Sequence, residues 1–171
     1  SRTAGRLNMP LDLPAHRLEL ALVHPQIAPN TGNVARLCVA TRTPLHLVRP
    51  LGFVLDDRRL RRSAMDYWPR LRLTVHDDLP AFQAAMHGRR LWFFEPSGAT
   101  CLWDAAFAPG DVLVFGSETH GLPLTGWVQD PRQVARIPQA PDERCLNLAT
   151  SCGIALYEAI RQTNAGGRHR A

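Results

Sequence analysis

Asparagine, glycine and arginine are concentrated between residues 29 and 36, which read Pro-Asn-Thr-Gly-Asn-Val-Ala-Arg. A turn of this composition that enters a helix leaves backbone N–H groups free to bind an anion. Arg36 would fall on the first turns of that helix, close enough to hold a phosphate. A helix capped by asparagine, with a surface arginine, explains the same residues equally well. Taken alone, this segment leaves both interpretations open.

Two further segments carry residue types suited to a binding site. Residues 115–123 place Glu118 between two glycines, directly after a buried apolar run. A ligand can approach such a backbone closely, and the carboxylate can hold a cation, a hydroxyl or a helix end; a capped turn is the alternative. Residues 137–150 place Asn147 at an expected helix start, where its side chain can cap the helix or bind a ligand.

All three segments follow expected strands. Strands are predicted from apolar runs, and helices from apolar residues at helical spacing. The predicted strands are 18–23, 45–48, 71–75, 91–94, 112–115 and 134–137, and the predicted helices are 30–40, 56–65, 79–87 and 146–162. This alternation predicts an α/β fold around a mainly parallel sheet. The three segments then lie after the carboxyl ends of strands, where α/β folds build their sites.

Length and composition fit one domain. The chain has 171 residues, of which 1–17 are predicted to be a flexible arm and 163–171 a flexible tail, leaving 18–162 as the folded domain. No apolar run approaches the length needed to cross a membrane, and the first residues do not form a signal peptide, so a cytoplasmic location is expected. Cys38, Cys101, Cys145 and Cys152 lack metal-ligand spacing, which predicts reduced thiols.

The positive charge belongs to the first half of the chain. Residues 1–75 hold 12 arginines and 5 acidic residues, whereas residues 76–171 hold 8 arginines and 10 acidic residues. All 20 basic residues are arginine, for which codon bias is the simplest explanation. Guanidinium groups bind phosphate bidentately and stack on bases. A run of four arginines on the predicted helix 56–65 is either a solvated face or a phosphate contact: Arg58, Arg59, Arg61 and Arg62.

Several common chemistries are excluded. Without lysine the chain cannot form the phosphate loop of an ATPase, and no Gly-x-Gly-x-x-Gly follows the first strand. The Gly-x-Ser-x-Gly elbow and the His-Glu-x-x-His pair are also absent from the sequence. The 7 histidines stand without ligand spacing, so no metal site is expected; His24 is most simply a turn residue.

Each segment alone is a weak motif, but the three together in this order along the chain form a specific one. Asn-x-Gly-Asn-x-x-Arg, then Phe-Gly-x-Glu-x-x-Gly-Leu-Pro, then Ile-Pro followed by Leu-Asn-Leu, resembles the SpoU branch of the SPOUT methyltransferases. The match is closer still to the tRNA (cytidine/uridine) wobble 2′-O-methyltransferases, to which residues 51–67 are also similar. The resemblance covers roughly residues 18–162.

The resemblance implies an α/β domain with helices on both faces of the sheet and a deep trefoil knot over about residues 112–157. It also implies S-adenosylmethionine as cofactor, no metal, and tRNA as substrate, methylated on the 2′-hydroxyl of the wobble nucleotide (C/U 34). A homodimer through the knot region is implied as well, with the last helix presenting Leu156, Tyr157 and Ile160. The residues expected to contact the cofactor are Phe94, Gly116, Ile137, Cys145 and Leu146.

The catalytic residues implied by the resemblance are Asn30, Arg36, Glu118 and Asn147. Because a guanidinium stays protonated in proteins, Arg36 is expected to grip a phosphate and position the hydroxyl rather than act as the base. Glu118 would orient Arg36 or Asn33, and Asn147 would hold the ribose or its own loop. Cys145 departs from the family's usual serine. The alternatives are methylation at another tRNA or ribosomal RNA position, and an RNA-binding dimer without catalysis.

Overall fold

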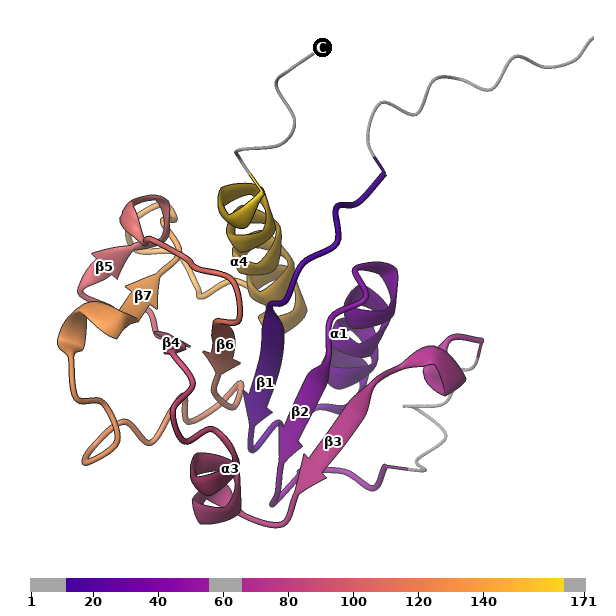
Figure 1. Ribbon diagram of the computed structural model, residues 1–171. Helices are drawn as coiled ribbons and strands as arrows, with labels where there is room; N and C mark the ends of the chain where they lie inside the picture. The colour runs from indigo at the N-terminus through magenta and orange to yellow at the C-terminus, as the bar shows by residue number, and fades with distance from the viewer. Residues whose placement is uncertain (1–11, 56–65, 165–171) are drawn as a thin grey trace, which may run out of the picture.

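A parallel sheet organises the chain. The computed structural model describes residues 12–55 and 66–164. Within them seven strands form one sheet in the order β3-β2-β1-β6-β4-β7-β5, with every neighbouring pair parallel (Figure 1). The strands are β1 Glu19–Val23, β2 Leu45–Val48, β3 Leu73–His76, β4 Leu91–Phe94, β5 Thr100–Cys101, β6 Val112–Phe115 and β7 Val134–Arg136. The predicted α/β class with a mainly parallel sheet is confirmed.

The helices are α1 Ala28–Ala40, α3 Leu79–Ala85 and α4 Leu148–Thr163, with short 3-10 helices at Trp68–Arg70, Leu102–Asp104 and Pro131–Gln133. α1 begins two residues before the prediction because Pro29 fits the first turn, where no N–H is needed. α4 begins two residues after it, because Asn147 is its cap. β5 was not predicted, since two residues carry no periodicity. The helix expected over 56–65 lies outside the described residues.

Helices cover both faces of the sheet. On one face, α1 and α4 pack together over the sheet through residues such as Val34, Cys38, Cys152 and Leu156 (Figure 1). On the other face, Phe82 of α3 and Met86, which directly follows this helix, pack with apolar side chains of β1, β4 and β6, joined by residues of the 122–128 loop. The central strands β1 and β6 are therefore buried on both faces, which explains their continuous apolar sequences.

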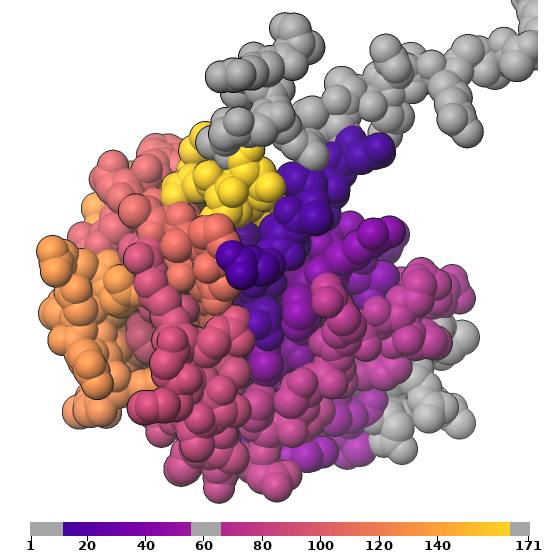
Figure 2. All heavy atoms as spheres, in the orientation of Figure 1, coloured from indigo at the N-terminus to yellow at the C-terminus, as the bar shows by residue number. Residues whose placement is uncertain are grey.

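The segment before β1 packs on the domain. His16 makes a 2.8 Å hydrogen bond to the carbonyl of Thr41, and its other ring nitrogen accepts from the Leu18 N–H. In Figure 2 this indigo segment runs between the yellow of α4 and the purple of α1. The arm predicted over 1–17 thus includes residues in contact with the domain; residues 1–11 lie outside the described part. No helix among the described residues is long and apolar enough to span a membrane.

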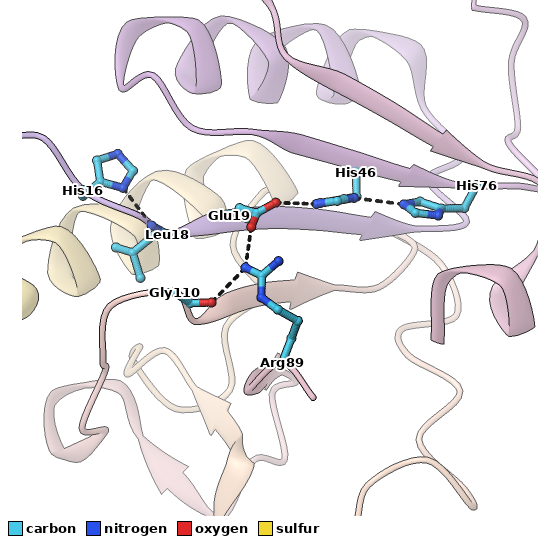
Figure 3. Close-up of polar contacts among 7 residues, drawn as sticks. All are labelled: His16, Leu18, Glu19, His46, His76, Arg89 and Gly110. Carbon is cyan, nitrogen blue, oxygen red and sulfur yellow. Dashed lines mark hydrogen bonds and ion pairs between the residues drawn. The ribbon is translucent and has the colours of Figure 1, made fainter. Parts of the chain in front are cut away.

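A buried polar chain crosses β1, β2 and β3 (Figure 3). Glu19 accepts hydrogen bonds from His46 at 2.8 Å and from Arg89, while His46 bonds His76 at 2.9 Å. The hydrogen bond from His46, with support from Arg89 and against the effect of burial, lowers the pKa of Glu19 from 4.5 to about 2. Burial, and then the neighbouring His46, lowers the pKa of His76. These hydrogen bonds therefore join three strands through the charged carboxylate of Glu19 and the neutral imidazole of His76.

These hydrogen-bonded side chains predict that the folded state loses stability in acid. Since the folded pKa of Glu19 is depressed, its stabilisation is present above pH 4.5 and is lost as pH falls from 4.5 toward 2. At roughly 1.4 kcal/mol per pKa unit, the fall from 4.5 to about 2 corresponds to at most about 3 kcal/mol, which solvent screening at this partly exposed carboxylate reduces. The pKa of His76 is also depressed, so a further loss of folding stability begins as pH falls through 6.5. In denaturant unfolding, Glu19→Gln should be less stable than wild type at pH 7, and the difference should shrink toward pH 3; a constant difference contradicts this.

Candidate active site

The three polar segments meet at one edge of the sheet. They follow β1, β6 and β7, and since all strands are parallel their carboxyl ends share that edge. β1 and β6 are direct neighbours, and β4 lies between β6 and β7. Residues more than 100 positions apart in the chain are thereby brought into contact, as the hydrogen bonds below show.

Two of the predicted catalytic residues touch. The Nδ2 of Asn147 donates a 3.0 Å hydrogen bond to Oδ1 of Asn30, which lies in the first turn of α1. Oδ1 of Asn147 meanwhile accepts from the N–H groups of Ala149 at 2.9 Å and Thr150 at 3.4 Å, capping α4. Asn147 therefore both caps its helix, as one of its two expected functions, and links the first segment to the third.

Glu118 holds the entry to α1. Its Oε2 accepts the N–H of Gln26 at 2.8 Å and its Oε1 accepts the N–H of Ile27 at 3.4 Å. Ile27 is the residue just before α1, so this carboxylate supplies the cap that the helix's own sequence lacks. Among the described residues these are the hydrogen bonds of Glu118, rather than the predicted contacts with Arg36 or Asn33. Of the roles considered for this carboxylate, the geometry favours the one in which it binds the end of a helix.

The turn after β6 is closed tightly on itself. Ser117 and Gly121 exchange backbone hydrogen bonds of 3.3 and 3.1 Å, and a Cβ on Gly116 would overlap the backbone of Gly121. Glu95, directly after β4, accepts the N–H of Leu122 and lies against Gly121. Sequence reasoning missed Glu95, although its place just after a buried strand is the same signal that identified Glu118.

Arg36 lies on the exposed side of α1. Its charge acts on Tyr67, whose pKa is raised by burial of the phenol and lowered in part by Arg36. The Tyr67 hydroxyl is buried and has no hydrogen-bond partner among the described residues. Tyr67 and Trp68 were candidates for stacking on a base or for burial; both are half-buried, and Trp68 packs against the core. Arg36 is thus an exposed residue of the same helix whose first turn contains Asn30.

The residues expected at the cofactor differ in exposure. Phe94 is buried and stacks on Phe115 at 4.6 Å between ring centroids, and Gly116 is buried as well. Ile137 is half-buried, whereas Cys145 is exposed and Leu146 is 37% exposed. Phe94 is therefore a core residue that reaches the edge with its backbone, while Leu146 presents an apolar side chain to solvent.

The four arginines predicted to contact RNA, Arg58, Arg59, Arg61 and Arg62, lie outside the described residues.

On α4, Leu156 and Ile160 are 0% and 3% exposed, because they face the core of their own chain. The prediction that they form an interface is therefore wrong, whereas Tyr157 at 53% and Ile154 at 40% do face outward. In the described part of the chain, no cluster of His, Cys, Asp and Glu is suited to a metal ion.

The family assignment follows from comparison with known proteins. Residues 17–157 match the SpoU rRNA methylase family, and the chain belongs to this family. The resemblance drawn from the three segments is thereby confirmed.

Particular relatives are similar over nearly the whole chain. The tRNA (cytidine(34)-2′-O)-methyltransferase of Methylovorus glucosotrophus is 43% identical over 152 residues, covering 87% of this chain and 97% of that protein. The enzyme of the same name from Escherichia coli K12 is 40% identical over 151 residues, covering 88% and 96%. A solved structure concerned with 2′-OH methylation of C/U34 on tRNA superposes with a TM-score of 0.81 at 44% identity, covering 86% of this chain and 96% of that one.

Proposed function

We propose that this protein is an S-adenosylmethionine-dependent methyltransferase that acts on the ribose 2′-hydroxyl of nucleotide 34, cytidine or uridine, in the tRNA anticodon loop. The observation that carries the proposal is the 3.0 Å contact between Asn30 and Asn147, which joins the first and third segments, with Arg36 exposed on the same helix as Asn30. Relatives at 40–43% identity, covered over 96–97% of their length and named for this reaction, support it.

The residues at this edge fit an adenosyl group. Leu146 and Ile137 offer apolar surface, and the closed turn from Gly116 to Gly121, which follows β6 at the same edge of the sheet, offers main-chain groups. Adenine sites combine such apolar shape with a few hydrogen bonds, often from the backbone. When bound, the cofactor supplies a methyl group made electrophilic by its sulfonium. The residues proposed to hold it are Phe94, Gly116, Ile137, Cys145 and Leu146.

The chain's own residues serve to orient the RNA. Arg36 stays protonated at every working pH and can hold a phosphate next to the target ribose through two N–H groups. The linked amides of Asn30 and Asn147 lie in the same region and offer hydrogen-bonding groups to the ribose. Orientation of a nucleophile can remove several kcal/mol of barrier, so positioning is the main contribution expected of these residues. Glu118 acts indirectly, by holding the turn that presents Asn30.

The remaining features of the resemblance belong to the same proposal. The arginines at 58, 59, 61 and 62 would contact RNA phosphates, with marked salt dependence. The outward-facing Ile154 and Tyr157 of α4 support a homodimer through this helix. The resemblance also implies a knot over about 112–157, which contains β6 and β7 with β4 between them in the sheet.

Incubation with labelled S-adenosylmethionine and total tRNA from a strain lacking the gene tests the proposal. We expect label in tRNA, and calorimetric binding of the cofactor by the protein alone. Absence of cofactor binding would remove the enzyme and leave the alternative of a non-catalytic RNA-binding dimer. In a parallel reaction with ribosomal RNA from the same strain, label in that RNA but not in tRNA would favour the other substrate class.

The four thiols provide an independent test of the cofactor's place. Burial raises the pKa of Cys38 to about 12 and that of Cys152 well above its ordinary value, so both should resist alkylation in the folded protein. Cys145 is exposed and should react first. Saturating S-adenosylmethionine should slow alkylation of Cys145 at least about tenfold, as mass spectrometry of the labelled peptide would show, with half-buried Cys101 as the control. Equal rates with and without cofactor would place the cofactor elsewhere.

A further inference from the structure

A second feature of the sheet edge is a pocket of about 260 Å³. It is lined by His24 and Gln26, which follow β1, by Leu79 at the start of α3, and by the turn after β6. That turn contributes Ser117, His120, Gly121, Leu122 and Pro123. Neither Asn30, Arg36 nor Asn147 belongs to this wall, and α3 lies on the face of the sheet opposite α1 and α4. The pocket thus shares the turn after β6 with the proposed cofactor site, but its wall includes none of Phe94, Gly116, Ile137, Cys145 and Leu146.

The pocket lies where the chain changes direction in the sheet. From β1 the chain runs through α1 to β2 and then β3 on one side, whereas from β6 it continues to β7 on the other side. β1 and β6 are neighbours, so the loops that follow them separate and leave a crevice at the carboxyl edge. In open α/β sheets this switch point is the usual place for a ligand. The topology alone therefore marks this pocket as a binding position.

The wall of the pocket is rigid around His24. This residue has the left-handed φ of 56°, a conformation that costs about 1 kcal/mol or more for a residue with a Cβ. Its N–H donates to Val48 at 3.0 Å, and its carbonyl accepts Nε2 of Gln26 at 3.0 Å. The backbone of Gln26 is in turn held by Glu118. Among the described residues, the buried Nδ1 of His24 has no hydrogen-bond partner.

These features select a planar heterocycle. Leu79, Leu122 and Pro123 offer apolar contact, while His24, His120 and Ser117 offer hydrogen-bonding groups, and no carboxylate or guanidinium lines the wall. The wall thus lacks arginine, the side chain best suited to phosphate, whereas a base stacks on imidazole or apolar side chains and hydrogen-bonds through its edge. A single base also needs less room than a drug-sized ligand, whose pockets run to about 300–1,000 Å³.

We infer that this pocket receives an unpaired nucleobase of the RNA, from a nucleotide that flanks the methylated one. The inference rests on the proposed function for the identity of the RNA. Only three residues separate Gln26 in the pocket wall from Asn30, and Glu118 holds the backbone between them. An RNA strand that crosses the sheet edge from the Asn30 contact toward α3 passes over this segment and reaches the pocket. Loops of RNA present splayed bases of this kind.

The test combines pocket variants with an abasic scan of an anticodon stem-loop RNA. His120→Trp fills the mouth of the pocket, and His24→Asn removes the imidazole while keeping a residue that tolerates positive φ. For both variants we expect a KM for RNA raised about tenfold, the value of one lost stacking contact, with cofactor affinity unchanged. Removing one particular flanking base should weaken binding to wild type by a similar factor, but should cost nothing further with His120→Trp, because both changes remove the same contact.

His87→Asn is the matched control, since His87 is exposed at the end of α3 and does not line the pocket. Circular dichroism would confirm that each variant is folded. Additive losses at every abasic position would overturn the inference, as would weaker cofactor binding by His120→Trp, which would assign the pocket to the cofactor. If wild type fails to methylate the intact RNA, the proposed function itself fails, and that outcome is read from the wild-type reaction alone.

Discussion

Arg36→Ala is expected to lower methyl transfer at least about 100-fold while leaving the Kd for S-adenosylmethionine nearly unchanged. Arg36 is exposed on α1, the helix whose first turn contains Asn30, and is proposed to hold the RNA rather than the cofactor. Loss of a group that orients the nucleophile costs about two orders of magnitude without any change in cofactor contacts. Single-turnover rates with labelled cofactor, together with calorimetry, separate the two quantities.

Two further variants make this prediction specific. Arg36→Lys keeps the charge but not the paired N–H groups, so we expect it to recover only a small part of the rate. Arg132→Ala removes an exposed arginine that precedes β7, at the opposite edge of the sheet, and should leave the rate unchanged. If Arg36→Ala abolishes cofactor binding instead, the placement of Arg36 on the RNA side is wrong.

Gly116→Ala is expected to damage both the fold and the cofactor site. A Cβ at this position would overlap the main chain of Gly121 and Leu122, which cannot move away as the end of a flexible side chain can. Overpacking against backbone costs about 1–3 kcal/mol, and the turn that closes on Gly121 is part of the proposed cofactor site. Denaturant unfolding should show this loss, and calorimetry should show cofactor affinity reduced at least about tenfold.

Gly153→Ala is the matched control for this substitution. Gly153 lies within α4, and a Cβ there meets nothing within 4 Å. Alanine in a helix interior is favoured over glycine by roughly 0.5–1 kcal/mol, so this variant should be as stable as wild type or more stable. Equal destabilisation by the two alanines would mean that the turn at Gly116 is not closed as described.

Much of the architecture could be predicted from local sequence. The strands at 45–48, 91–94 and 112–115 match β2, β4 and β6 residue for residue, because short apolar runs buried on both faces have clear limits. The strand expected at 71–75 is shifted to Leu73–His76, since the 3-10 helix at Trp68–Arg70 ends just before it. The order of the strands does not follow from these patterns; it depends on packing between segments far apart in the chain.

The candidate site was located well, and its internal contacts less well. Asn30, Glu118 and Asn147 do meet at one edge, because each follows a strand of one parallel sheet. Their partners could not be predicted, since Glu118 was expected to orient Arg36 and instead caps α1 through backbone N–H groups of Gln26 and Ile27. Hydrogen bonds from a side chain to a backbone group far away in the sequence carry no local sequence signal. The same holds for Glu95, whose partner is the N–H of Leu122.

The most direct test of the account is to map the methyl group itself. Substrate tRNA labelled by the wild-type protein would be digested to nucleosides and oligonucleotides and analysed by mass spectrometry. The account predicts a single 2′-O-methylated cytidine or uridine, located at the wobble position of the anticodon. A methyl group on a base would contradict the ribose chemistry, and a 2′-O-methyl at another position would contradict the assigned substrate site.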